Sequence, residues 1–141
     1  PYKGIDCLIG AMPSVLELVP NAHLLIAGQN WSDWQEPYGQ LIEQLGIEDH
    51  VTTVLRYIPM SEVAEIFQAV DLVVLPYKYF DAQSGVGNIA LAFELPLLVT
   101  RVGGLPALVK DDKALVEPDN SNQLANGISN VFLNPQLYLK F

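Results

Sequence analysis

Short apolar runs rich in branched side chains alternate along this chain with longer stretches whose apolar residues recur at helical spacing. Such alternation is typical of βαβ units and of a parallel sheet. The runs LLIA at 24–27 and LVVL at 72–75 are apolar on both faces, as expected of strands that helices cover on both sides. The sequence therefore predicts an α/β fold, with a doubly wound, mostly parallel sheet in a three-layer α/β/α sandwich. The expected strands are 23–27, 51–55, 72–75, 97–100 and 114–116.

Helices are predicted between these strands from apolar periodicity and from end signals. Pro13 lies inside the first helix and is expected to kink or split it. Gly46 is placed to end the second helix, and Ser61 is the expected N-cap of the third. The last helix follows a start signal at Asp119-Asn120-Ser121. The expected helices are 5–19, 38–45, 61–69, 84–93 (beginning at Ser84 or Gly85) and 123–133, with one helical turn at 105–109.

The chain is short and acidic, which bounds its organisation and its partners. Its 141 residues suggest one domain, 1–141. Seven Lys and Arg against sixteen Asp and Glu give a net charge of −9, which argues against a nucleic-acid binder and a polybasic membrane anchor. No apolar stretch approaches the ~20 residues that span a bilayer. The single cysteine, Cys7, excludes an internal disulfide.

The order of the predicted elements begins with a helix, whereas a βα repeat begins with a strand. We therefore expect a piece of a longer protein, cut just after a strand. Ligands of open α/β sheets bind beyond the carboxyl ends of the strands, where the strand order reverses. With the absent strand counted as the first, the loops 2–4 and 76–87 are expected to face each other across that crevice.

The second of these loops leads into a helix whose first turn holds Gly85 and Gly87. Each glycine costs a helix about 1 kcal/mol relative to alanine. One reason to accept this cost is the approach of a phosphate to bare N–H groups at the positive end of the helix. Lys3 would add a full positive charge from across the crevice. The alternative is that the glycines serve close packing of helix and sheet, and the residues alone do not decide between the two.

Other chemistries have weaker support. Ser84 is not a hydrolase nucleophile elbow, because Ala82 and Val86 stand where that motif needs glycines and both histidines precede the serine. His23 and His50 flank strands, and structural roles are expected for them. No Cys/His cluster has zinc spacing, and the dinucleotide fingerprint G-x-G-x-x-G is absent. We therefore expect neither a metal site nor a dinucleotide site.

A series of short motifs occurs in a defined order along almost the whole chain. In this order and spacing they resemble the C-terminal, donor-binding half of GT-B glycosyltransferases of the group 1 type (family 4). Each motif is short, but the ordered combination is specific. The motifs are Lys3-Gly4-Ile5-Asp6, LLIAG at 24–28, Tyr57 with Val63-Ala64 and Phe67, AVDLVVLPY at 69–77, Gln83-Ser84-Gly85-Val86, TRVGGLP at 100–106, and Val116-x-Pro118-x-Asn120.

The resemblance implies a retaining transferase that moves a sugar from a nucleotide diphosphate sugar to a glycan, lipid or small-molecule acceptor. It makes Lys3 and Asp81 the implied catalytic residues. Lys3 would contact the donor diphosphate, and Asp81 takes the place of a glutamate near the transferred sugar. No metal cofactor is expected, because protein cations and a helix N-terminus would stabilise the leaving charge. The implied donor-binding residues are Lys3, Gly4, Tyr57, Gln83, Ser84, Gly85 and Val86.

The chain departs from the family pattern at further positions. Ile89 replaces the glutamate that usually holds the ribose, Glu94 replaces a glycine, and Ala107 replaces a second glutamate. Two alternatives follow: a non-catalytic nucleotide-sugar-binding module on the same fold, and a nucleotide-sugar epimerase.

The resemblance also places the acceptor site on an N-terminal domain that this chain lacks. We therefore expect the isolated chain to be inactive and its parent to be cytoplasmic, either in solution or peripheral at the inner membrane face. No nucleic-acid partner and no transmembrane segment are expected.

Overall fold

The computed structural model describes residues 3–28, 38–79 and 85–134 of the chain. Helices and strands alternate along them as the sequence predicts. Within these ranges, no helix is both long enough and apolar enough to cross a membrane. The elements are α1 (Ile5–Leu18), β1 (Leu24–Ala27), α2 (Gln40–Leu45), η2 (Glu48–His50), β2 (Val51–Val54), α3 (Met60–Gln68), β3 (Val73–Leu75), α4 (Gly85–Ala92), β4 (Leu97–Thr100), η3 (Leu105–Leu108), η4 (Asp112–Ala114), β5 (Leu115–Val116) and α5 (Ser121–Leu133).

Among the described residues, every strand pair is parallel, and the strands form two sheets. One sheet pairs β1 with β2, in register from Leu24 opposite Val51. The other has the order β3-β4-β5, with Val73 opposite Leu97 and Val99 opposite Leu115. In the part of the chain that the structure describes, β1 and β3 do not pair with each other.

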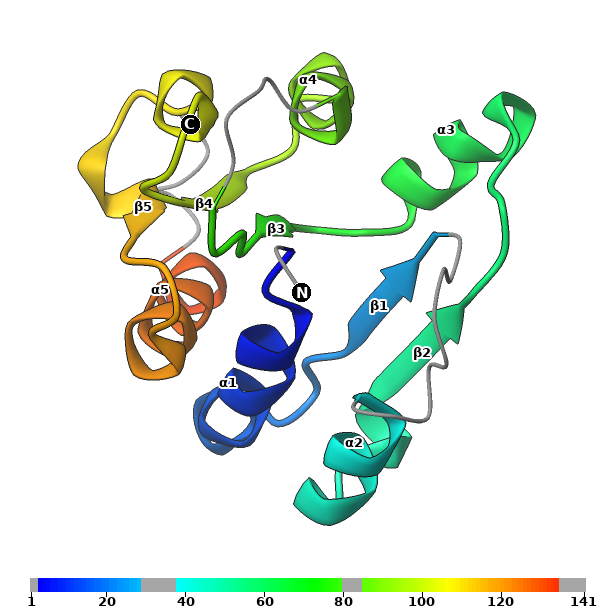
Figure 1. Cartoon of the computed structure of the whole chain (residues 1–141), viewed down its shortest axis with the longest axis vertical. Coiled ribbons are helices and arrows are strands. Elements are labelled where there is room, and N and C mark those ends of the chain that lie inside the picture. The colour runs from blue at the N-terminus through cyan, green and yellow to red at the C-terminus, as the bar shows by residue number, and fades with distance from the viewer. Residues whose placement is uncertain (1–2, 29–37, 80–84, 135–141) are drawn as a thin grey trace.

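Helices cover both faces of these sheets. Figure 1 shows α1, α2 and α5 on one side and α3 and α4 on the other. All of β4 is buried, and its side chains alternate between two cores. Leu98 joins the core under α1 and α5, whereas Leu97 and Val99 join the core under α4 and η3. This alternation is the two-residue period of a strand, and it confirms the predicted three-layer α/β/α sandwich.

Helix α1 runs without a break through Pro13, so the expected split is wrong. Proline removes one hydrogen bond inside a helix, which costs about 3 kcal/mol. The helix offsets this cost because it is buried deeply between its neighbours. Ile9 and Val15 are fully buried, and Ala11 and Met12 are nearly so.

Three residues or motifs were predicted to begin or end a helix, and two of these signals act as predicted. Gly46 ends α2 in the left-handed region, with φ 67, as predicted. The side chain of Asn120 accepts a hydrogen bond from the N–H of Gln123, so the predicted start signal caps α5, which begins two residues earlier than expected. Ser61 is not an N-cap: α3 begins at Met60 after Pro59, whose extended backbone ends the preceding loop.

A residue with a strained backbone lies two positions after the end of helix α4. Glu94 has φ 57, a conformation in which a Cβ crowds the neighbouring carbonyl. The N–H of Glu94 donates to the Leu91 carbonyl (3.0 Å) and the N–H of Leu95 donates to the Ala90 carbonyl (3.1 Å). These two bonds form a Schellman motif, in which the residue at the position of Glu94 is usually glycine.

We expect Glu94→Gly to raise the free energy of unfolding by about 1 kcal/mol, because glycine removes the left-handed strain. Urea denaturation of both proteins, followed by circular dichroism, measures the change. Glu65→Gly is the matched control: Glu65 is exposed inside α3, where glycine should instead destabilise by about 1 kcal/mol. A loss of stability in both variants would contradict this account of Glu94.

Candidate functional site

The turn at Lys3-Gly4 lies directly against the loop that follows β3. Gly4 precedes α1 with φ 70, and a Cβ built on it would lie only 1.8 Å from the carbonyl oxygen of Pro76. No side chain fits there, so the two backbones are in contact. Lys3 is exposed beside this contact. The two loops that the sequence predicts to face each other therefore do meet, at Gly4 and Pro76.

The first residue of α4, Gly85, lies on the surface of the described part of the chain. Gly85 is exposed, and no atom lies within 4 Å of a Cβ built on it. Close packing against the described chain therefore does not require glycine at this position. Val86 is also exposed (41%), whereas Gly87 is buried, so the packing explanation applies only to Gly87. Among the described residues, none packs against the position that a side chain at Gly85 would take.

The other predicted site residues are less closely placed. Asp81, Gln83 and Ser84 lie outside the described residues. Tyr57 is 66% exposed and lies beyond the carboxyl end of β2. Strand β2 belongs to the sheet of β1, whereas β3 and β4 belong to the other sheet. The structure thus brings Lys3 and Gly4 together with the loop after β3. It places Tyr57 at the end of a different strand, β2.

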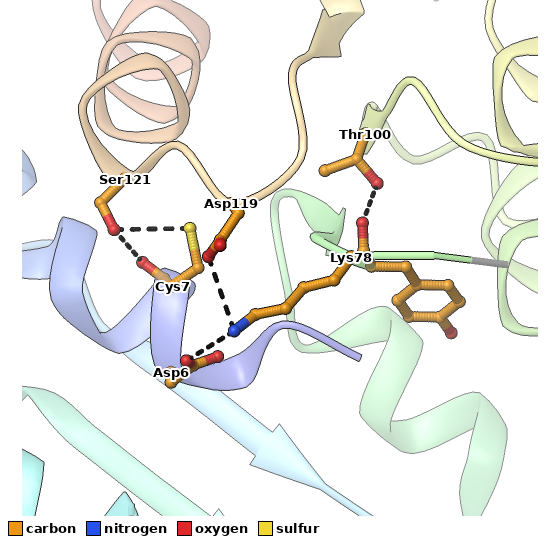
Figure 2. Close-up of polar contacts among 7 residues, drawn as sticks. Asp6, Cys7, Lys78, Thr100, Asp119 and Ser121 are labelled. Atoms are coloured by element: carbon orange, nitrogen blue, oxygen red, sulfur yellow. Dashed lines mark hydrogen bonds and ion pairs between the residues drawn. The ribbon is translucent and has the colours of Figure 1, made fainter. Parts of the chain in front are cut away.

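A cluster of charged residues that the sequence did not single out is centred on Lys78 (Figure 2). The Nζ atom of Lys78 lies 2.8 Å from Oδ2 of Asp6 and 3.5 Å from Oδ1 of Asp119. Asp6 belongs to the first turn of α1, and Asp119 to the connection between β5 and α5. The sequence does contain a signal for this cluster: a lysine and two aspartates occur where predicted strands lead into predicted helices.

The ionisation of this cluster follows from its contacts. Partial burial works to raise the pKa of Asp6, but the hydrogen bond from Lys78, the N–H of Cys7 and the charge of Lys78 together hold it below its ordinary value. The hydrogen bond to Asp6 raises the pKa of Lys78 in spite of some burial. A lowered carboxyl pKa stabilises the fold above the unfolded pKa, and this stabilisation is lost as pH falls through the folded value. At neutral pH the Asp6 carboxylate and the Lys78 ammonium group are therefore both charged.

The loop after β3 is also held from the side of β4. The hydroxyl of Thr100, a buried residue, donates to the carbonyl of Tyr77 at 2.6 Å and lies 3.5 Å from that of Leu75. A threonine at the end of the otherwise apolar strand LLVT is the sequence signal that could have predicted this contact. The buried hydroxyl fixes the path of the backbone immediately before Lys78.

The two histidines make structural contacts at the opposite edge of the small sheet. Nε2 of His23 lies 2.6 Å from the Thr52 hydroxyl, and Nδ1 of His50 lies 3.3 Å from the Ala22 carbonyl. Among the residues with a described placement, no group of three His, Cys, Asp or Glu side chains could hold a metal ion.

The fold and the site together define a Rossmann-like α/β domain. Its glycine-bearing loops lie at the carboxyl ends of parallel strands. Over residues 1–141 the chain matches the family described as glycosyl transferases group 1, and it belongs to that family. The resemblance to glycosyltransferases of the group 1 type is thereby confirmed.

Relatives and solved structures agree with this assignment. The chain is 33% identical over 122 residues to a D-inositol 3-phosphate glycosyltransferase from Segniliparus rotundus, with 85% of the chain covered. Its fold matches a sucrose-phosphate synthase from Thermosynechococcus elongatus, with a TM-score of 0.84, 28% identity and 99% of the chain covered. It also matches HepE from Anabaena, solved in complex with UDP, with a TM-score of 0.86, 23% identity and 99% of the chain covered.

The chain accounts for a minor part of each of these proteins. It spans 27% of the Segniliparus glycosyltransferase, 35% of the synthase chain and 38% of the HepE chain. The synthase and HepE structures have the GT-B architecture, to which the parallel α/β fold of this chain corresponds.

Proposed function

We propose that this chain is the donor-binding domain of a retaining glycosyltransferase, which transfers a sugar from a nucleotide diphosphate sugar to an acceptor. The observation that carries the proposal is the contact between Gly4 and Pro76, which holds the exposed Lys3 beside the start of the loop after β3. The open first turn of α4 at Gly85 supplies N–H donors on the same loop. A cation and a helix N-terminus suit a diphosphate.

In this proposal the protein stabilises the charge that develops on the departing nucleoside diphosphate. Lys3 binds the diphosphate oxygens with a full positive charge, and the N-terminus of α4 adds its dipole and its unsatisfied N–H groups. Groups placed in advance around a developing charge are often the largest catalytic contribution. Asp81, near the transferred sugar in the family pattern, would act on the sugar itself.

We further propose that the domain works with a second domain that carries the acceptor site. The share of each relative that the chain spans supports this view, as does the separation of β1 and β3 into two sheets. A strand supplied by a preceding segment would pair with both. The 141-residue chain alone should then transfer no sugar, whereas the intact protein that contains it should.

The proposal is tested by incubating the intact protein with a panel of UDP- and GDP-sugars and candidate acceptors, with analysis of the products by NMR. A new glycosidic bond that keeps the anomeric configuration of the donor supports the proposal. Donor binding without any transfer would instead assign a non-catalytic binding module. An epimerised nucleotide sugar would assign an epimerase.

We expect Lys3→Ala in the intact protein to weaken binding of the donor nucleotide about thirtyfold, because a charge-assisted bond to phosphate is lost. Calorimetric titration with UDP and GDP measures the change. Lys113→Ala is the matched control, since Lys113 is exposed in η4 at the amino end of β5, the opposite edge of the sheet. Equal effects of the two substitutions would contradict the assignment of Lys3.

A further inference from the structure

Lys78 joins three segments that are far apart in the sequence. It follows β3, and its ammonium group lies between the carboxylates of Asp6, at the start of α1, and Asp119, before α5 (Figure 2). The Lys78 side chain is only 29% exposed, less than either carboxylate partner. Two carboxylates at these distances neutralise its charge locally, so the amine is directed to the protein and not to a ligand.

The segments that Lys78 joins are tied to one another by further contacts. The hydroxyl of Ser121, the first residue of α5, donates to the carbonyl of Cys7 in α1 at 3.1 Å. Thr100 holds the carbonyl of Tyr77 from the other side. The loop between β3 and α4 therefore leaves the sheet from a point that is fixed on both flanks.

Asp119 contributes to this cluster at a cost in its own backbone. It has φ 57, in the left-handed region that only glycine adopts without strain, although aspartate tolerates it better than most residues. Strain of this kind persists where surrounding contacts over-determine a conformation, and it concentrates at functional sites. The ion pair with Lys78 is one such contact.

The position of the cluster connects it to the proposed donor site. Asp6 lies three residues after Lys3, and Lys78 lies two residues after Pro76, whose carbonyl touches Gly4. The ion pair between Lys78 and Asp6 therefore ties the Lys3-Gly4 turn to residues 76–79 of the loop after β3. The geometry of a diphosphate site depends on the spacing between these two segments.

We propose that Lys78 is a positioning residue of the donor site: it holds the Lys3-Gly4 turn and residues 76–79 after β3 at the spacing that a diphosphate requires, without binding the phosphates itself. The inference rests on the proposed function. It differs from the role of Lys3, because the effect of Lys78 passes through Asp6 and Asp119.

The test is a double-mutant cycle in the intact protein, with Lys78→Met, Asp6→Asn, the two combined, and Lys78→Arg. Calorimetry with UDP and GDP gives the Kd values, and steady-state kinetics give the KM for the donor sugar and kcat. We expect each single substitution to weaken binding about fivefold and the combination to weaken it no further, as for residues that act through one contact. Lys78→Arg, which keeps the ion pair, should bind within about twofold of the wild type.

Other outcomes separate the alternatives. If Lys78 bound phosphate directly, Asp6→Asn would release its charge and leave binding equal or tighter, and that result would overturn the inference. Lower Tm values with unchanged Kd and KM would reduce Lys78 to a structural residue and overturn it as well. Should Lys78→Met fail to fold, Asp6→Asn compared with Lys78→Arg carries the same contrast.

The failure of this inference is distinguishable from the failure of the proposed function. A wild-type protein that binds neither nucleotide nor nucleotide sugar overturns the proposed function and the inference together. A wild-type protein that binds them, with variants that bind equally well, overturns only the role of Lys78.

Discussion

Replacing Gly4 by alanine is expected to lower the free energy of unfolding by at least about 3 kcal/mol. The new Cβ would lie 1.8 Å from the carbonyl oxygen of Pro76 and 2.8 Å from its carbonyl carbon. Both of these atoms belong to the backbone, so no flexible side chain can give way. The left-handed φ of 70 adds strain of its own. The loop after β3 would have to move away from α1.

Gly46→Ala separates the two causes. Gly46 has nearly the same left-handed backbone, with φ 67, but nothing lies within 4 Å of a Cβ built on it. Its substitution should therefore cost only the backbone strain, about 1 kcal/mol. Urea denaturation of both variants, followed by circular dichroism, measures the difference. Equal losses would show that Gly4 is needed for its φ alone and that the contact with Pro76 is not tight.

Leu98→Ala is expected to destabilise the protein by about 3 kcal/mol, because a fully buried side chain in the middle of β4 is lost and leaves a cavity. Leu98 lies against α5, where Gly127 allows close approach. A Cβ built on Gly127 would lie 3.0 Å and 3.1 Å from the two δ-carbons of Leu98. The cavity would thus open directly beneath the glycine.

Gly127→Ala should recover part of this loss when it is combined with Leu98→Ala. In the wild type the added methyl group crowds Leu98, but in the variant it enters the space that Leu98 leaves, and alanine favours the helix by about 1 kcal/mol. We expect Gly127→Ala to be more favourable in the Leu98→Ala background than in the wild type by 1 to 2 kcal/mol, about the usual coupling of touching residues. Costs that simply add would contradict this packing account.

The course of the strands was predictable because buried parallel strands need apolar side chains on both faces. The run LLVT at 97–100 forms β4, and both ends of this strand are at the predicted residues. The strands expected at 72–75 and 114–116 each begin one residue later, since pairing starts at Val73 opposite Leu97 and at Leu115 opposite Val99. Pairing partners decide such ends, and a single strand does not contain them.

The helix signals were less secure where packing opposes local preference. Pro13 favours a break, but the burial of α1 between the sheet and α5 outweighs the lost hydrogen bond. Ser61 favours a cap, but the chain enters α3 one residue earlier, through Pro59. In both cases the neighbouring elements decide the outcome, and local propensity is only a weak prior.

Apolar periodicity and motif order are properties of the chain read residue by residue. They were therefore enough to predict the layered α/β fold, the family, and the meeting of the Lys3-Gly4 turn with the loop after β3. The pairing of Lys78 with Asp6, 72 residues away, and with Asp119 follows only from the packed fold. An ion pair exists only at separations of a few ångströms, and three distant segments reach such separations only once their helices and strands have packed.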